Sequence, residues 1–294
     1  MSLTRRHLLK LAAAGALGVT VVGPRRATAA MTLPAATAVL VDVARCIGCR
    51  QCEGACKAYH GFPPGLSTDL APNAFTYVQV RRLRKPLPHL TLGEGSADRR
   101  SYKVQCWNCA EPACASACPV AALRKTPEGP VTYDPYRCIG CRYCQLACPF
   151  HIPRFEWHRA LPVITKCNMC AERLAKGLEP VCVSVCPAHA LQFGPRRQIL
   201  AEAASRIADH PDRYVPAIYG VEEVGGTSWL YVSDVPFEDL GFPVVVRQAL
   251  PNYTWRVMGK IPGAVVAIGA TLTAVETVIR RRMEMQRQGE RERR

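Results

Sequence analysis

The sequence predicts a loop-rich globular body with an internal duplication, followed by one membrane-spanning helix. Three observations lead to this prediction: 24 prolines with only 7% aromatic residues, four groups of cysteines that repeat along the chain, and an apolar segment close to the C-terminus. With 294 residues, of which 49% are hydrophobic, the chain is long enough for about two domains with a buried core.

The first 29 residues have the pattern of an export signal. The pair Arg5-Arg6 precedes an apolar run over residues 11–22, and the small residues Ala27-Thr28-Ala29 follow. Paired arginines before a short apolar run are typical of the twin-arginine signal. We therefore expect the twin-arginine export machinery as a partner, and a cofactor inserted before export. An ordinary secretory signal or an N-terminal anchor is the alternative, although so short an apolar run lacks the length that spans a bilayer.

A second apolar segment predicts a membrane-spanning helix over residues 258–280. Residues 261–279 are apolar except for Glu276, and about twenty such residues cross a hydrocarbon core. Seven arginines follow within residues 280–294, so the positive-inside rule places that tail in the cytoplasm. The body would then lie on the periplasmic side of the inner membrane. A buried core helix is the alternative interpretation.

All sixteen cysteines fall into four groups of four. The groups are Cys46-x2-Cys49-x2-Cys52-x3-Cys56, Cys106-x2-Cys109-x4-Cys114-x3-Cys118, Cys138-x2-Cys141-x2-Cys144-x3-Cys148 and Cys167-x2-Cys170-x11-Cys182-x3-Cys186. The first and third groups share the letters RCIGCR at 45–50 and 137–142, and PACASACPVAAL at 112–123 aligns with PVCVSVCPAHAL at 180–191. The pattern indicates a duplication.

This spacing predicts four [4Fe–4S] clusters with all sixteen cysteines as iron ligands. Three thiolates from one tight loop can bind one cluster, while a fourth thiolate three residues on binds another. Gly48 and Gly140 relieve the crowded turns, and a proline follows three of the fourth cysteines, whereas Lys57 follows Cys56. Zinc ribbons, which take four ligands from two pairs, and a disulfide framework, which would strain the Cys-x2-Cys loops, are the weaker alternatives.

The net charge of +15 raises the possibility of a nucleic-acid partner. Much of that charge lies in the two terminal segments, and bound iron–thiolate groups would add negative charge to the body. We expect no nucleic-acid partner, and the basic run Arg81, Arg82, Arg84 and Lys85 is interpreted as a solvated or partner-facing patch.

The nested cysteine groups at 46–186, the twin-arginine start and the single C-terminal anchor together resemble a known family. They are similar to the four-cluster electron-transfer subunits of membrane-bound periplasmic oxidoreductases, most closely the iron–sulfur subunit of hydrogenase-2-type [NiFe] hydrogenases. Formate dehydrogenase-N beta and dimethyl sulfoxide reductase iron–sulfur subunits are related. The segment at 219–243 is also similar to one in anchored members.

The resemblance implies an α+β fold of two pseudo-symmetric ferredoxin-like lobes over residues 30–194, and a docking extension over 195–257. It also implies cross-paired ligands. Cys46, Cys49 and Cys52 would pair with Cys186; Cys167, Cys170 and Cys182 with Cys56; Cys106, Cys109 and Cys114 with Cys148; and Cys138, Cys141 and Cys144 with Cys118.

The function implied by the resemblance is the transfer of single electrons between a periplasmic catalytic subunit and a quinone-reactive membrane subunit. The favoured catalytic subunit is that of a [NiFe] hydrogenase. A formate dehydrogenase or another molybdenum oxidoreductase is the alternative partner. A catalytic iron–sulfur enzyme is a further alternative, but every thiol belongs to a complete set and no phosphate loop or nucleophile–base pair is recognisable. We also expect Trp107, Tyr143 and Trp157 to shield clusters from water.

Overall fold

The computed structural model describes residues 36–83, 98–157 and 163–293, so the expected export signal lies outside the described residues. The chain divides into two units, one over Ala30–Pro251 and one that includes Asn252–Arg294. The first unit mixes helices and strands, as expected. Many of its elements are only two to five residues long, which agrees with the loop-rich composition.

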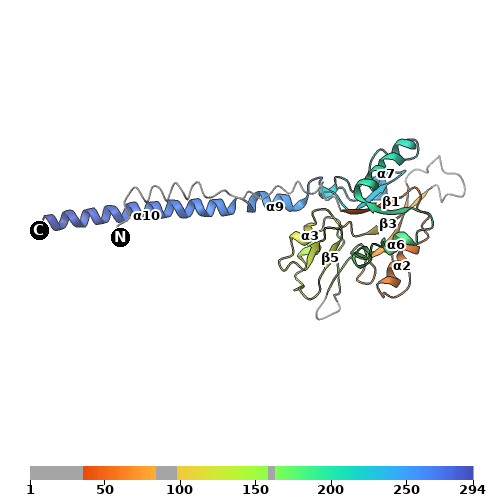
Figure 1. Cartoon of the computed structure of the whole chain (residues 1–294), viewed down its shortest axis with the longest axis horizontal. Coiled ribbons are helices and arrows are strands. Elements are labelled where there is room, and N and C mark those ends of the chain that lie inside the picture. The colour runs from red at the N-terminus through yellow and green to blue at the C-terminus, as the bar shows by residue number, and fades with distance from the viewer. Residues whose placement is uncertain (1–35, 84–97, 158–162, 294) are drawn as a thin grey trace. The chain divides into compact units, whose positions relative to one another are not determined.

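A three-stranded sheet forms the centre of the first unit (Figure 1). Its middle strand β1 (Thr37–Asp42) pairs with β8 (Leu191–Pro195) in antiparallel fashion and with β9 (Trp229–Val232) in parallel. Both β1 and β9 are almost continuous runs of apolar residues, which is the pattern of strands buried on both faces. The sequence patterns did not predict β9.

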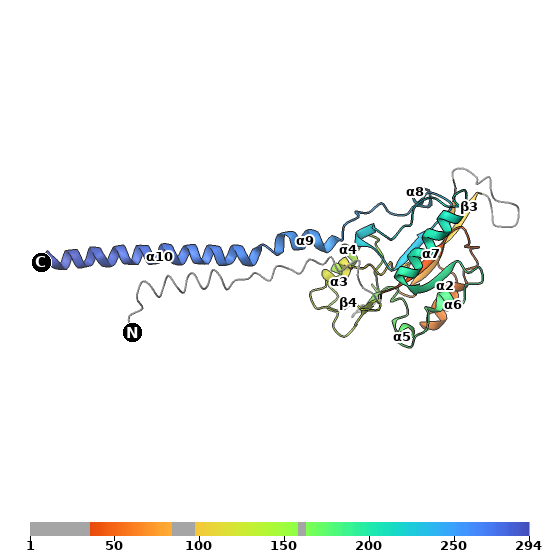
Figure 2. The same cartoon turned by 45° about the horizontal axis from the view of Figure 1, so that its top comes forward.

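The two faces of the sheet bury different sets of side chains. Ala38 and Leu40 of β1 pack with Ile199 and Ala203 of α7 (Arg196–Asp209), which lies along the sheet in Figures 1 and 2. The alternate β1 residues belong to the core that contains Trp107 and cysteines from several of the motifs. Because successive side chains of a strand point to opposite faces, one strand supports both the helix and the cysteine-rich core.

Short hairpins and helices surround this sheet. The hairpins are β2 (Thr76–Arg82) with β3 (Arg99–Gln105), β4 (Leu123–Lys125) with β5 (Val131–Tyr133), and β6 (Arg154–Phe155) with β7 (Ile164–Thr165). The helices are α2 (Gln51–Tyr59), α3 (Ala113–Ser116), α4 (Tyr143–Ala147), α5 (Ala171–Leu174), α6 (Val181–Ser184) and α8 (Phe237–Leu240), with a 3-10 turn at Glu223–Gly225. Helices α2, α3, α4 and α6 each carry at least one of the cysteines.

The C-terminal segment is helical. Helix α9 (Leu250–Met258) is followed by α10 (Ile261–Glu292), and this part of the chain is long and apolar enough to cross a membrane. At 1.5 Å per residue, the 32 residues of α10 extend about 48 Å, more than the roughly 30 Å of a hydrocarbon core. The hydroxyls of Thr271, Thr273 and Thr277 donate to carbonyls four residues back, so these polar groups are satisfied within the helix.

A buried ion pair links the β2–β3 hairpin to the segment after β9. The Arg100 guanidinium donates to both carboxylate oxygens of Asp234, with Nε–Oδ2 at 2.9 Å and Nη2–Oδ2 at 2.6 Å. Both side chains are almost completely buried. Such a pair is costly to break, because the partner left behind is a buried, uncompensated charge.

Replacement of Asp234 by alanine should therefore lower the free energy of unfolding by about 3–5 kcal/mol. A urea titration of the detergent-solubilised protein, followed by circular dichroism, measures this. The control is R82A, because the Arg82–Asp98 pair is largely exposed and should contribute less than about 1 kcal/mol. Equal losses in D234A and R82A would contradict the importance of the buried pair.

Candidate metal centres

All sixteen cysteines lie among the described residues as free thiols. The structure gathers them into four sets of four, and each set combines three cysteines of one motif with the last cysteine of another. We name the sets sites I to IV. Site I is Cys46, Cys49, Cys52 and Cys186; site II is Cys106, Cys109, Cys114 and Cys148; site III is Cys118, Cys138, Cys141 and Cys144; site IV is Cys56, Cys167, Cys170 and Cys182.

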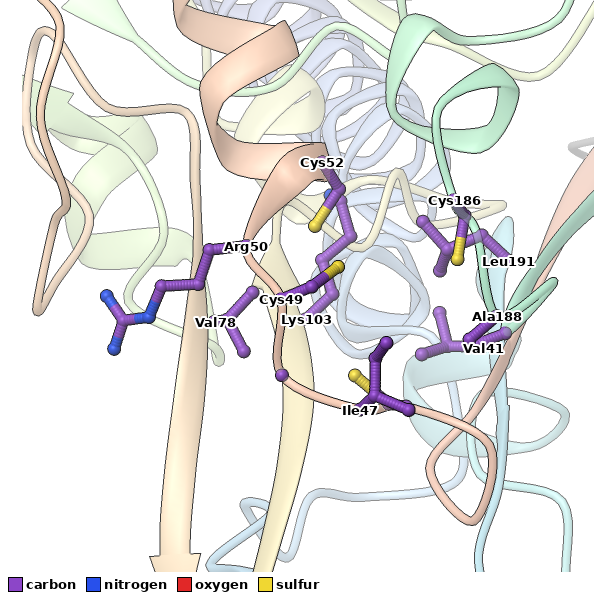
Figure 3. A pocket seen from close by; sticks show the side chains of 13 residues that line it. Val41, Ile47, Cys49, Arg50, Cys52, Val78, Lys103, Cys186, Ala188 and Leu191 are labelled. Atoms are coloured by element: carbon purple, nitrogen blue, oxygen red, sulfur yellow. The ribbon is translucent and has the colours of Figure 1, made fainter. Parts of the chain in front are cut away.

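Site I surrounds a largely apolar cavity, shown in Figure 3. Cys49 lies on the loop before α2, Cys52 lies in the first turn of α2, and Cys186 faces them from the segment after α6 (Figure 3). Apolar side chains, including Val41 and Leu191 of the central sheet, complete the wall. The sheet therefore positions the two chain segments that form the site.

Site III surrounds a second cavity, whose wall includes Leu123, Tyr133 and Ile164. It is built from the repeat of the site I motif. Burial, and then Cys114, Cys138 and Cys118, raises the pKa of Cys144 to about 11, so a cysteine of site II also lies close to this site.

Sites II and IV are more deeply buried. Burial, and then Cys106, Cys148 and Cys114, raises the pKa of Cys109 well above its ordinary value. Burial also raises the pKa of Cys56 to about 12, with Lys103 acting against it and Cys182 and Cys170 adding to it. All four cysteines of site IV are buried.

The duplicated motifs have duplicated backbone geometry. Gly48 and Gly140 have φ of 71° and 69°, and Arg50 and Arg142, which precede α2 and α4, have φ of 60° and 63°. Left-handed conformations recur at Asn108 and Met169, and at Ala121, His151 and His189, each three residues after a fourth cysteine. Equal spacing of cysteines thus accompanies equal local folding.

The donor set fits a polynuclear iron–sulfur group. Within the described residues, no group of three or more His, Cys, Asp or Glu is arranged so that it could hold a metal ion. The thiols of sites I and III instead line the walls of cavities. Burial raises the pKa of Cys46 to about 11 and of Cys52 and Cys114 to about 12. Because a thiolate is the metal ligand, iron must displace these protons, and the binding energy then adds to folding.

Neighbouring sites form a series. Cys182 of site IV raises the pKa of Cys52 of site I, and Cys106 of site II raises that of Cys167 of site IV, in both cases after the larger effect of burial. Cys114 of site II likewise raises the pKa of Cys144 of site III. The three pairs of neighbours together give the order I, IV, II, III. Exposed cysteines occur only at the two ends, Cys49 in site I and Cys141 in site III.

Three buried or half-buried lysines lie among the sites, and sequence reasoning missed them. Lys103 lies beside sites I and IV, and Lys125 and Lys166 lie beside site II. Burial lowers the pKa of Lys125 to about 8, whereas the thiolates around Lys103 outweigh the effect of burial and raise its pKa. A single lysine in a strand, or directly after one, gives no signal of this role in the sequence.

Of the three aromatic residues expected to shield clusters, only Trp107 is buried. It stacks on Phe150, with ring centroids 4.9 Å apart, in the core beside Cys106 and Cys148. Tyr143 and Trp157 are 59% and 64% exposed, so the expectation was wrong for them. Trp157 packs instead against the Arg142 guanidinium, which lies 4.0 Å from its ring centroid.

Comparison with known proteins shows the family to which the chain belongs. Residues 100–196 match the family described as 4Fe-4S dicluster domain. The chain is 34% identical to the hydrogenase-2 operon protein HybA of Escherichia coli O157:H7 over 284 residues, which cover 82% of this chain and 84% of HybA. The chain belongs to the family of iron–sulfur electron-transfer subunits of oxidoreductase complexes.

Other relatives of the subunit serve different oxidoreductases. It is 32% identical to the formate dehydrogenase iron-sulfur subunit of Haemophilus influenzae, over 81% of this chain and 78% of the relative. It is 36% identical to the B subunit of the anaerobic dimethyl sulfoxide reductase of Escherichia coli K12, over 53% of this chain and 71% of the relative. The family resemblance predicted from the sequence is confirmed.

Substitution of Gly48 by alanine should disrupt site I. A Cβ there would lie 2.6 Å from Ser101 Oγ and 3.1 Å from Ser101 Cβ, in a backbone with φ of +71°. G140A meets only ordinary contacts and should cost about 1–2 kcal/mol for the left-handed backbone. G54A, on α2 with open space, is the neutral control. The number of iron atoms retained per chain, measured in the purified variants, should fall most in G48A. The same iron content in G48A, G140A and G54A would contradict this prediction.

Proposed function

We propose that sites I to IV each hold one [4Fe–4S] cluster and that the subunit carries single electrons between a periplasmic catalytic subunit and a quinone-reactive membrane subunit. A cluster held by four thiolates supplies reversible one-electron reduction. The ligand sets are the four sites as defined above, and the cross-pairing implied by the family resemblance is the same. The observation that carries the proposal is the series of four neighbouring sites.

The burial of the sites supports a conduit. Sites II and IV hold no exposed cysteine, whereas Cys49 and Cys141 bring the end sites to the surface. The neighbouring side chains of Ile47 and Ile139 are 63% and 65% exposed, which suits contact with a partner protein. In this arrangement the interior residues exclude water from the middle sites, and the end sites exchange electrons with partners.

We propose the following organisation of the chain into segments. Residues 1–29 are a twin-arginine signal, and 30–194 form two ferredoxin-like lobes with pseudo-symmetry. Residues 195–257 extend the body towards partners, 258–280 span the inner membrane, and 281–294 are cytoplasmic. The repeated left-handed residues in the two halves support the lobes, and the single apolar C-terminal helix supports the anchor.

A [NiFe] hydrogenase is the proposed catalytic partner, because the hydrogenase-2 operon protein HybA aligns over most of both chains. The formate dehydrogenase relative aligns over a similar share, so a formate dehydrogenase is the alternative. The subunit itself is proposed to be non-catalytic, because all sixteen thiols belong to complete sets.

Replacement of Cys138 by alanine should interrupt electron flow without inactivating the partner. In native membranes, the C138A variant should lose at least nine tenths of hydrogen-dependent quinone reduction, whereas hydrogen oxidation with a soluble dye should persist, because the dye bypasses the subunit. The isolated wild-type subunit should contain about sixteen iron atoms and should oxidise neither hydrogen nor formate. Equal loss of both activities in an assembled complex, or turnover by the isolated chain, would refute the conduit.

The two ends of the chain should control its location. With Arg5 and Arg6 both changed to lysine, we expect the protein to remain in the cytoplasm. Truncation before Met258 should release a soluble periplasmic protein, because α10 is the anchor. Cell fractionation and protease protection measure both results. Normal export of the double-lysine variant, or membrane retention of the truncated one, would contradict the proposed topology.

A further inference from the structure

Lys103 is a buried cation whose charge the polypeptide leaves largely uncompensated. It lies on β3 with 2% of its surface exposed. Its Nζ donates to Gln105 Oε1 at 3.0 Å and lies 4.5 Å from the centroid of the Trp229 ring. Within the part of the chain that the structure describes, no carboxylate forms an ion pair with it. A buried ammonium without an anionic partner is costly, so a negative charge is expected close by.

The negative groups that act most strongly on Lys103 are thiolates from two different sites. They are Cys52 of site I, and Cys56, Cys167 and Cys182 of site IV. Figure 3 shows the Lys103 side chain along the wall of the site I cavity, close to Cys52. One ammonium therefore lies between two adjacent members of the series.

The other two lysines are held differently. Lys125 Nζ donates to the backbone carbonyls of Asn108, at 2.9 Å, and Gly129. Lys166 Nζ likewise donates to the carbonyls of Val131 and Cys167. Such bonds fix loops, and the two cysteines that act on Lys125, Cys109 and Cys106, both belong to site II. Lys103 makes no such backbone bond among the described residues, and its surroundings are two thiolate sets.

We propose that Lys103 is a fixed positive charge shared by sites I and IV, which raises the reduction potential at both. The inference rests on the proposed function, in which both sites hold [4Fe–4S] clusters. Reduction adds one electron, and hence one negative charge, at a site. A nearby cation in a low-dielectric interior stabilises that added charge, and the proton stays on Lys103 throughout.

The test is a redox titration of the purified, cluster-loaded complex at pH 7, followed by electron paramagnetic resonance. In K103M and K103Q, two of the four midpoint potentials should fall by at least about 59 mV. For a one-electron couple, this shift corresponds to a tenfold change in the reduction equilibrium constant. K103R keeps the charge and should restore both. In the matched control K125M, only one midpoint potential should shift, and it should be neither of the two that shift in K103M and K103Q.

The outcomes separate this inference from the proposed function. Wild-type protein without about sixteen iron atoms would refute the clusters themselves. With iron intact, unchanged midpoints in K103M and K103Q, or an equal shift of all four couples, would overturn the role of Lys103. If the neutral variants lose iron and K103R retains it, the need for a charge is supported. Loss of iron in all three variants would show a space-filling role and overturn the inference.

Discussion

Compensation of buried negative charge on sulfur is the constraint on which this structure depends. Most of the sixteen thiols are buried or half-buried, and burial raises the pKa of Cys46 to about 11 and of Cys52 and Cys114 to about 12. As thiolates they require a cation, because an isolated charge is unstable in a low-dielectric interior. Iron is the main counter-charge in the proposed function, and the buried ammonium groups of Lys103 and Lys166 lie among the same sulfurs. The interior is therefore organised around charge balance as much as around apolar packing.

The two copies of the duplicated motif adopt the same local backbone conformation at equivalent residues. A loop that turns three thiols towards one cavity needs left-handed backbone at fixed positions, and Gly48 and Gly140 supply it at identical places. Non-glycine residues adopt the same conformation at Arg50 and Arg142, where the helix that carries the third cysteine begins. Because the last cysteine of each motif reaches another motif's set, neither half can complete its sites alone. Cross-pairing thus joins the repeats into one folding unit.

The sequence was sufficient for features with a short-range signal and insufficient for those created by tertiary contact. Cysteine spacing predicted the family, and the apolar run at 261–279 predicted a long apolar helix, both of which are confirmed. By contrast, Arg100 and Asp234 meet across 134 positions, and Lys103 gains its surroundings only when two distant motifs pack around it. The exposure of Tyr143 and Trp157 could not be predicted either, because proximity in sequence to a cysteine does not fix the direction of a side chain.

The segment beyond the last cysteine takes part in the architecture of the first site. Asp42, at the end of β1, is fully buried and accepts hydrogen bonds at 2.8 Å from Arg206 of α7 and from the Tyr214 hydroxyl. The same carboxylate accepts a bond from the backbone amide of Arg45, immediately before Cys46. Strand β9, which also follows the last cysteine, pairs along β1 up to Asp42. The loop that carries the first cysteines of site I is therefore held by residues far away in the chain, and a change in α7 or β9 would act on site I through β1, without touching a sulfur.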